Sequence, residues 1–143
     1  TLRVVLQSVY PVVALRTEGD ANWVVMDGKY RVIGVRNTDP NVPTVIVTAP
    51  ITLTVGKPVI DEVTVETLRI VVRLAEELFT VKTITLVDKD TIKLSLDDGR
   101  SALFTPKKDE LLQLRALQAI LADDTMIKGV RTIDVRFSQP VLR

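Results

Sequence analysis

The sequence contains no cysteine and no histidine among its 143 residues. Without cysteine there are no disulfides, thiol nucleophiles or thiolate zinc sites, and without histidine the commonest general base and metal ligand are missing. The six glycines are isolated, so the chain has no glycine-rich phosphate-binding loop. No serine lies in a G-x-S-x-G motif. We therefore predict a protein that is not an enzyme and that has no cofactor and no metal site.

The chain also lacks an excess of one charge and a long apolar run. Its 19 basic and 18 acidic residues give a net charge of +1 and are interleaved along the sequence, which argues against nucleic-acid binding. No stretch reaches the roughly 18 consecutive apolar residues that cross a bilayer as a helix. Because the sequence begins within a strand-like run, we expect it to be a piece of a longer protein, which leaves a membrane anchor in the parent open.

Apolar residues make up 46% of the chain, which is enough to build a core. Strand-like runs occupy the N-terminal part, at residues 2–6, 12–15, 22–26 and 29–33. The last two runs are joined by Asp27-Gly28, which predicts a hairpin with a type I′ turn because that turn requires positive φ. Residues 37–58 hold four of the seven prolines and are expected to form a connector with one or two short strands.

After this connector the apolar period changes from two to between three and four. The change predicts a helix that starts near Thr64, with Asp61 or Thr64 as its cap. Its apolar face is expected to contain Leu68, Val71, Val72, Ala75, Leu78 and Phe79. Period two then returns in three runs separated by Asp-rich turns, which predicts an antiparallel meander over residues 83–87, 92–96 and 101–104.

A second helix is predicted to open at Thr105-Pro106, since threonine is a common N-cap and proline is favoured at the first helical position. Leu111, Leu114, Leu117 and Leu121 would line one side of it, and Asp123 and Asp124 would end it. A last strand is predicted over residues 131–137. The fold class is therefore α+β, a mostly antiparallel β-sheet with two main helices packed on one face.

Carboxylates offer the only residues from which an active site could be built. Asp88, Asp90, Asp97 and Asp98 could surround a cation, but the spacing of a calcium-binding loop is absent, and we interpret them as turn residues. A pair of acids of the glycosidase kind stays open, because sequence alone does not show which carboxylates share a cleft.

The run at residues 131–137 is the last element and therefore a candidate edge strand. Edge strands expose backbone groups that can pair with a strand of another protein. Phe137 beside Arg136 is a combination enriched at binding hot spots. The alternation equally allows Phe137 to be a core residue on the face of Ile133 and Val135, with Asp134 pointing the other way. Both interpretations stay open at this stage.

Taken in order, several segments resemble the extracytoplasmic region of the FtsQ/DivIB family of bacterial cell-division proteins. They are residues 2–6 with 10–14, 25–30, 42–45, 94–99 and 132–137. The first pair resembles the end of that family's POTRA domain, where an apolar strand runs into a Pro-x-x-Ala step, here Pro11 to Ala14. The last resembles its closing strand, with Val135 in place of the usual leucine. The resemblance extends over nearly the whole chain.

The resemblance implies a partial POTRA-like domain, which would end in a hairpin, over residues 1–22 and an FtsQ-type β domain over residues 23–143. It implies a non-enzymatic divisome scaffold that acts in septum formation, anchored in the cell inner membrane by a single helix outside this chain, with its folded part on the periplasmic side. The implied partners are FtsB/DivIC-like and FtsL-like division proteins, bound by strand addition at the last strand. The implied partner-binding residues are Arg136, Phe137, Ser138, Val141 and Leu142.

Two other functions remain as alternatives. A carboxylate-dependent cell-wall hydrolase would require paired acids in one cleft and a perturbed carboxyl pKa. Another extracytoplasmic binding module, such as a POTRA-type module of outer-membrane assembly or secretion, would show repeated β-α-α-β-β units, and the sequence contains no such repeat.

Overall fold

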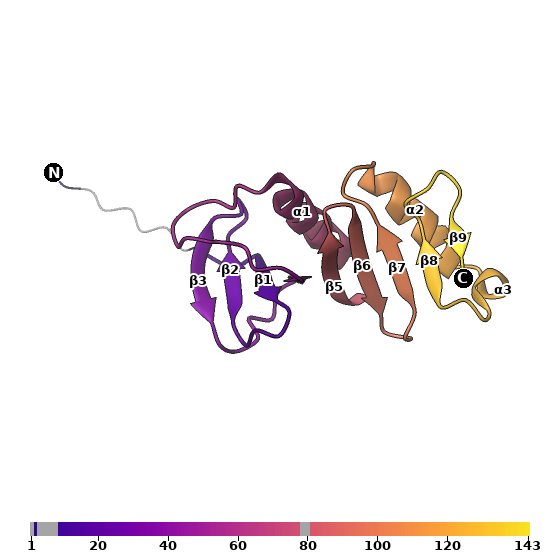
Figure 1. The fold of residues 1–143 in the computed structure, drawn as a ribbon, viewed down its shortest axis with the longest axis horizontal. Helices are drawn as coiled ribbons and strands as arrows, with labels where there is room; N and C mark the ends of the chain where they lie inside the picture. The colour runs from indigo at the N-terminus through magenta and orange to yellow at the C-terminus, as the bar shows by residue number, and fades with distance from the viewer. Residues whose placement is uncertain (1, 3–8, 78–80) are drawn as a thin grey trace.

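The computed structural model describes residue 2, residues 9–77 and residues 81–143 (Figure 1). The strand expected at residues 2–6 falls, apart from Leu2, outside the described residues. Leu78 and Phe79, expected at the end of the first helix, also lie outside them.

The described residues form one mixed sheet with three helices, as an α+β fold requires. The strands are β1 (Val13–Thr17), β2 (Trp23–Met26), β3 (Val32–Arg36), β4 (Thr44–Val47), β5 (Val81–Asp88), β6 (Thr91–Leu96), β7 (Ser101–Phe104), β8 (Thr132–Asp134) and β9 (Val141–Leu142). The helices are α1 (Glu62–Glu77), α2 (Glu110–Leu121) and α3 (Asp124–Ile127). In space the strand order is β3-β2-β1-β4-β5-β6-β7-β8-β9.

Most neighbouring strands run antiparallel, which confirms the predicted sheet type. The exceptions are the pairs β1–β4, β4–β5 and β7–β8, which are parallel. The meander β5-β6-β7 is antiparallel throughout and forms the middle of the sheet. A parallel neighbour needs a connection that returns to the same end of the sheet, and α1 and α2 lie in two of these connections.

The core lies between the sheet and its two longer helices. A row of residues in register across five strands is buried, namely Val45, Ile84, Leu94, Ala102 and Ile133. It joins one core with buried residues of α1 and α2, among them Leu68, Val71, Leu74, Leu114 and Leu117. Figure 1 shows both helices behind the sheet, on the same face, as the sequence predicts.

Helix α1 begins where the sequence places it. The Asp61 carboxylate accepts hydrogen bonds from the Thr64 backbone N–H at 2.9 Å and the Thr64 hydroxyl at 2.6 Å, so Asp61 is the residue that caps the helix. Leu68 and Val71 of the predicted apolar face are fully buried. The helix is therefore fixed both by its cap and by its packing.

The predicted start of the second helix is wrong. Helix α2 begins at Glu110, and its N-cap is Asp109, whose carboxylate accepts from the backbone N–H groups of Leu111 and Leu112. Thr105 instead lies in a loop because its backbone groups are bonded to the side chain of Gln113. At the other end, α2 stops at Leu121, and Asp123 is the N-cap of α3.

The predicted hairpin is present as β2–β3, but its turn differs. Tyr30, with φ of 59°, takes the positive φ expected at Gly28. The Tyr30 N–H donates to the Asp27 carbonyl at 3.0 Å, and the Asp27 carboxylate accepts from the N–H groups of Lys29 and Arg31. These bonds favour a longer loop in place of a two-residue turn.

Residues 37–58 contain one short strand, β4, and a single bridge between Arg31 and Pro58. β1 pairs with β2 on one side and with β4 on the other. Residues before and after position 22 therefore share one sheet, and the division into residues 1–22 and 23–143 stays a prediction.

Candidate protein-binding site

The five residues singled out in the sequence lie together at one edge of the sheet. Arg136, Phe137 and Ser138 belong to the loop between β8 and β9, and Val141 and Leu142 form β9 itself. In Figure 1 this yellow loop rises beside α2. β9 ends the strand order, so its outer side is an edge of the sheet within the described residues.

The last strand is shorter than predicted. β8 ends at Asp134, the chain bends at residues 136–139, and β9 folds back antiparallel to β8. The tail after Pro140 thus covers the edge of β8. The alternation expected for residues 131–137 breaks down here: Ile133 and Val135 are buried as predicted, but Asp134 is fully buried and Phe137 is 52% exposed.

The pairing of β9 determines which of its backbone groups face outward. Thr132 and Arg143 exchange two backbone hydrogen bonds, both 3.0 Å long. Directions alternate along an antiparallel strand, so the N–H and C=O of Leu142 point away from β8. Pro140 has no N–H, and its carbonyl is the next group on that side. A partner strand would therefore find few main-chain groups here.

Asp134 and Arg136 are joined by three hydrogen bonds. Oδ1 of Asp134 accepts from the Arg136 backbone N–H at 3.1 Å and from Nε at 2.9 Å, and Oδ2 accepts from Nη2 at 2.7 Å. The hydrogen bonds from the Arg136 side chain hold the pKa of the Asp134 carboxyl below its usual value, against the opposite effect of burial. A buried carboxylate is thus kept ionised by a paired, hydrogen-bonded cation.

Phe137 lies over a groove between the loop and α2. The groove has a volume of about 450 Å³, and its apolar lining includes Leu112, Ala116, Val135 and Phe137. Two cations flank the Phe137 ring: the guanidinium carbon of Arg136 is 5.6 Å and Nζ of Lys108 is 5.8 Å from the ring centroid. Both distances fall within cation–π range. Phe137 is therefore not a core residue but an exposed aromatic held beside a groove.

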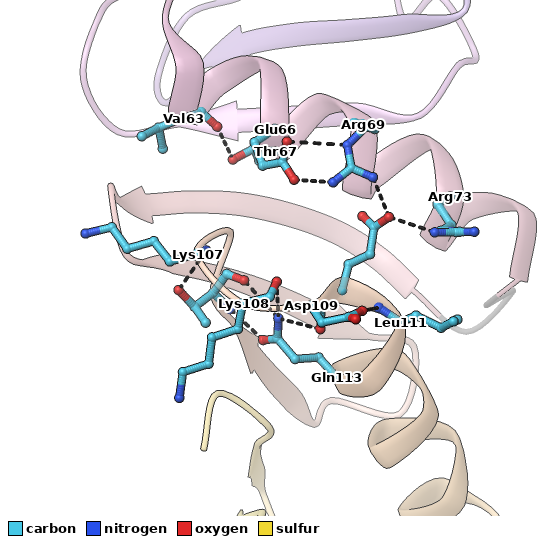
Figure 2. Close-up of polar contacts among 12 residues, drawn as sticks. Val63, Glu66, Thr67, Arg69, Arg73, Lys107, Lys108, Asp109, Leu111 and Gln113 are labelled. Atoms are coloured by element: carbon cyan, nitrogen blue, oxygen red, sulfur yellow. Dashed lines mark hydrogen bonds and ion pairs between the residues drawn. The ribbon is translucent and has the colours of Figure 1, made fainter. Parts of the chain in front are cut away.

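The other wall of this groove is fixed by Gln113. Its side-chain Nε2 donates to the carbonyls of Thr105, Lys108 and Asp109, and its Oε1 accepts from the Thr105 N–H at 2.8 Å. Figure 2 shows this amide pointing into the loop that carries Lys108. Gln113 and Lys108 were not among the residues predicted from the sequence; a polar residue within the leucine face of a predicted helix was the available signal for Gln113.

Helix α2 is also tied to α1 by charge. Oε1 of Glu110 accepts from Nη1 of both Arg69 and Arg73, the latter at 2.7 Å, and Arg69 also pairs with Glu66 (Figure 2). The side chain of Glu110 is only 9% exposed, whereas those of Arg69 and Arg73 are 46% and 45% exposed. The hydrogen bonds that Arg69 donates to Glu66 and Glu110 raise the pKa of Arg69 above its usual value.

Of the four aspartates predicted in the turns of the meander, Asp90, Asp97 and Asp98 occupy turns, whereas Asp88 is the last residue of β5. Asp88 accepts from the Asp90 N–H, Asp98 accepts from the Arg100 N–H, and Asp90 forms an ion pair with Lys107. Over residues 9–77 and 81–143 no three acidic side chains gather as a metal site would require. In the same residues, none of the helices combines the length and the hydropathy needed to cross a bilayer.

Comparison with known proteins identifies no family for this chain. Its sequence matches no protein-family model, and it has no significant match among curated proteins.

Proposed function

We propose that this chain is the partner-binding region of a non-enzymatic scaffold of the bacterial divisome, of the FtsQ/DivIB type. In this proposal it binds FtsB/DivIC-like and FtsL-like proteins by strand addition at its C-terminal edge during septum formation. The POTRA-like part at residues 1–22, the single-pass anchor in the inner membrane and the periplasmic location belong to the same proposal and rest on the sequence resemblance.

The observation that carries the proposal is an edge strand next to an exposed aromatic residue. β9 directs the backbone groups of Leu142 outward, and Phe137, 52% exposed, lies beside a groove in the adjoining loop. Strand addition uses such backbone groups for affinity and neighbouring side-chain pockets for the choice of partner. Residues 135–138 form one wall of the groove and lead directly into β9, so one short partner segment is proposed to use both the groove and the edge.

Side chains have to supply most of the affinity. Each backbone hydrogen bond contributes about 1 kcal/mol net, whereas a micromolar complex requires about 8 kcal/mol. Because β9 offers few outward groups, burial of Phe137, Val141 and Leu142 is the larger expected contribution. Removing a central aromatic anchor commonly costs about 2 kcal/mol or more, roughly thirtyfold in affinity.

Calorimetry with the extracytoplasmic segment of the cognate FtsB/DivIC-like partner tests the proposal. Phe137→Ala and a truncation after Phe137, which removes β9, are both expected to weaken binding at least about tenfold. Val35→Ala is the matched control, because Val35 is 58% exposed on β3 at the opposite edge of the sheet. Circular dichroism and urea unfolding establish that each variant is folded.

Three outcomes would overturn the proposal in different ways. If neither C-terminal variant changes the affinity, the proposed C-terminal site is wrong, although the proposed partner is right. No binding by the wild-type chain, together with release of fragments from purified peptidoglycan, favours the hydrolase, and no binding without turnover favours a different extracytoplasmic binding module.

A further inference from the structure

We propose that Asp134, Arg136 and Thr91 form a clamp that holds Phe137 in its binding conformation, which makes Asp134 a positioning residue of the site. This inference rests on the proposed function, since it concerns how the same loop is prepared for a partner. Neither the sequence nor the resemblance assigns such a role to Asp134 or Thr91.

Asp134 has no exposed surface, so a docked partner cannot touch it without unfolding the edge. Its carboxylate oxygens both point to Arg136, two residues along the chain, in the three hydrogen bonds described above. The bond to the Arg136 N–H closes a local turn immediately after β8, which is where the chain leaves the sheet. Any effect of Asp134 on a partner must therefore act through Arg136.

Arg136 carries the constraint to a distant strand. Its Nη1 donates to the Thr91 hydroxyl at 3.0 Å, at the beginning of β6 and 45 residues away in sequence. The guanidinium is thus bonded through Nε and Nη2 to Asp134 and through Nη1 to Thr91. A guanidinium fixed at three nitrogens has one orientation, and its planar donor geometry is not reproduced by lysine.

Phe137 has few other restraints. In the part of the chain that the structure describes, no side chain of residues 137–140 makes a hydrogen bond, and outside the β8–β9 pairing neither does their backbone. The Phe137 ring is flanked instead by Arg136 and Lys108. Fixing the backbone of one residue costs about 1–2 kcal/mol, so a loop of this length needs an anchor to remain in one conformation. The clamp is the anchor on its β8 side.

The charges of the clamp also limit what Arg136 can do for a partner. Its positive charge is already neutralised by Asp134, and its side chain is only 26% exposed. The family resemblance implies that Arg136 contacts the partner directly. The geometry favours a different role, in which Arg136 orients Phe137, and the charge beside the ring that has no ion-pair partner among the described residues is that of Lys108, which is exposed.

Binding kinetics distinguish positioning from contact. If Asp134→Asn lets the loop leave its binding conformation, only a fraction of molecules can bind, and the apparent affinity falls by that fraction. We expect the association rate constant for the cognate FtsB/DivIC-like segment to fall about fivefold or more, with the dissociation rate constant changed less than about twofold. Phe137→Ala removes a contact and is expected to act mainly on dissociation.

The chain offers matched controls. Asp98 and Arg100 form a similar Asp-x-Arg ion pair beyond the opposite end of β6, so Asp98→Asn removes a carboxylate of the same spacing, though a more exposed one, away from the Phe137 loop. Thr91→Ser keeps the hydroxyl and should bind as the wild type does, whereas Thr91→Val should slow association in the same direction as Asp134→Asn.

Hydrogen–deuterium exchange of the full 143-residue chain supplies a readout that needs no partner. We expect faster exchange of the amides of residues 136–142 in Asp134→Asn than in the wild type or Asp98→Asn, by more than the change in global stability measured by urea unfolding accounts for. Unchanged exchange there, or an unchanged association rate constant in a folded Asp134→Asn variant, would overturn the clamp. A wild-type chain that does not bind the partner overturns the proposed function instead, and exchange alone then decides whether Asp134 orders the loop.

Discussion

The carboxylate of Asp134 is fully buried and is paired with the guanidinium of Arg136, whose own side chain is 26% exposed. The two partners therefore differ in what happens when the other is removed. Arg136 can turn towards water, whereas Asp134 cannot. This asymmetry makes the pair open to direct test.

Arg136→Ala is expected to lower the free energy of unfolding by about 3–5 kcal/mol, because it leaves a buried carboxylate without its cation. Asp134→Asn should cost less, about 1–2 kcal/mol, since the remaining guanidinium can be hydrated. Urea unfolding followed by circular dichroism measures both variants. Equal losses, or a larger loss for Asp134→Asn, would contradict the burial of Asp134.

The pH dependence of stability follows from the lowered pKa of the Asp134 carboxyl. A group whose pKa is lower in the folded than in the unfolded state stabilises the fold above the unfolded value and loses this contribution as the pH falls through the folded value. We expect the wild type to lose stability below about pH 4, and Asp134→Asn to lose less over the same range. Urea unfolding between neutral pH and pH 3 compares them, and identical slopes for the two proteins would exclude Asp134 as a source of acid sensitivity.

In the Arg69–Glu110–Arg73 group, replacing the carboxylate is likewise expected to cost less stability than replacing the arginines. Glu110→Gln leaves two arginines that are almost half exposed and that retain Glu66 and Glu77 as partners, so the expected loss is about 1 kcal/mol. The double change Arg69→Met with Arg73→Met keeps the apolar stems but leaves a buried carboxylate unpaired, at an expected cost of about 3 kcal/mol or more.

Urea unfolding followed by circular dichroism, as for the Asp134 variants, measures the loss of unfolding free energy in Glu110→Gln and in the double methionine variant. High salt should reduce the effect of Glu110→Gln only slightly, because the carboxylate itself is buried. A Glu110→Gln variant less stable than the double methionine variant would show that the arginines, and not Glu110, carry the cost of desolvation.

Gln113→Glu should destabilise the chain more than Gln113→Ala. The Nε2 atom of Gln113 faces three carbonyl oxygens, and an ionised carboxylate in that position has no proton to donate to them. We expect a loss of about 1–3 kcal/mol for alanine and a larger loss for glutamate, which lessens as the pH falls and the new carboxyl becomes protonated. Thermal unfolding at pH 7 and pH 4 checks the order, and a glutamate variant as stable as the wild type would contradict the loop geometry.

Elements with a strong local signal could be predicted from the sequence. The period of the apolar residues and the Asp61 cap predicted α1, and alternation with Asp-rich turns predicted the meander β5-β6-β7. The apolar period and the helix cap depend on residues close together in the chain, so both can be recognised from the sequence alone. The α+β class followed from the order of these elements.

The start of α2 depended instead on a contact with no local signal. Thr105-Pro106 has the pattern of a helix start, but Gln113 binds the backbone of Thr105, and Asp109 becomes the cap. At the hairpin, the hydrogen bonds of the Asp27 side chain favour a loop in which Tyr30, and not Gly28, has the positive φ. In both places a polar side chain forms hydrogen bonds with backbone groups, and these bonds favour a local structure different from the one that the local sequence pattern predicts.

For the candidate site, the sequence by itself placed Arg136 and Phe137 at the end of the predicted last strand, and the resemblance to the FtsQ/DivIB family added Ser138, Val141 and Leu142. Only the tertiary structure decided that the strand stops at Asp134, that β9 folds back as the new edge and that Phe137 is exposed. The physical reason is the pairing of Asp134 with Arg136. Alternation places the Asp134 carboxylate on the opposite side of the strand from Ile133, yet this carboxylate is buried because Arg136, two residues later, binds it. That pairing ends the strand and overrides the period of two on which the sequence prediction relied.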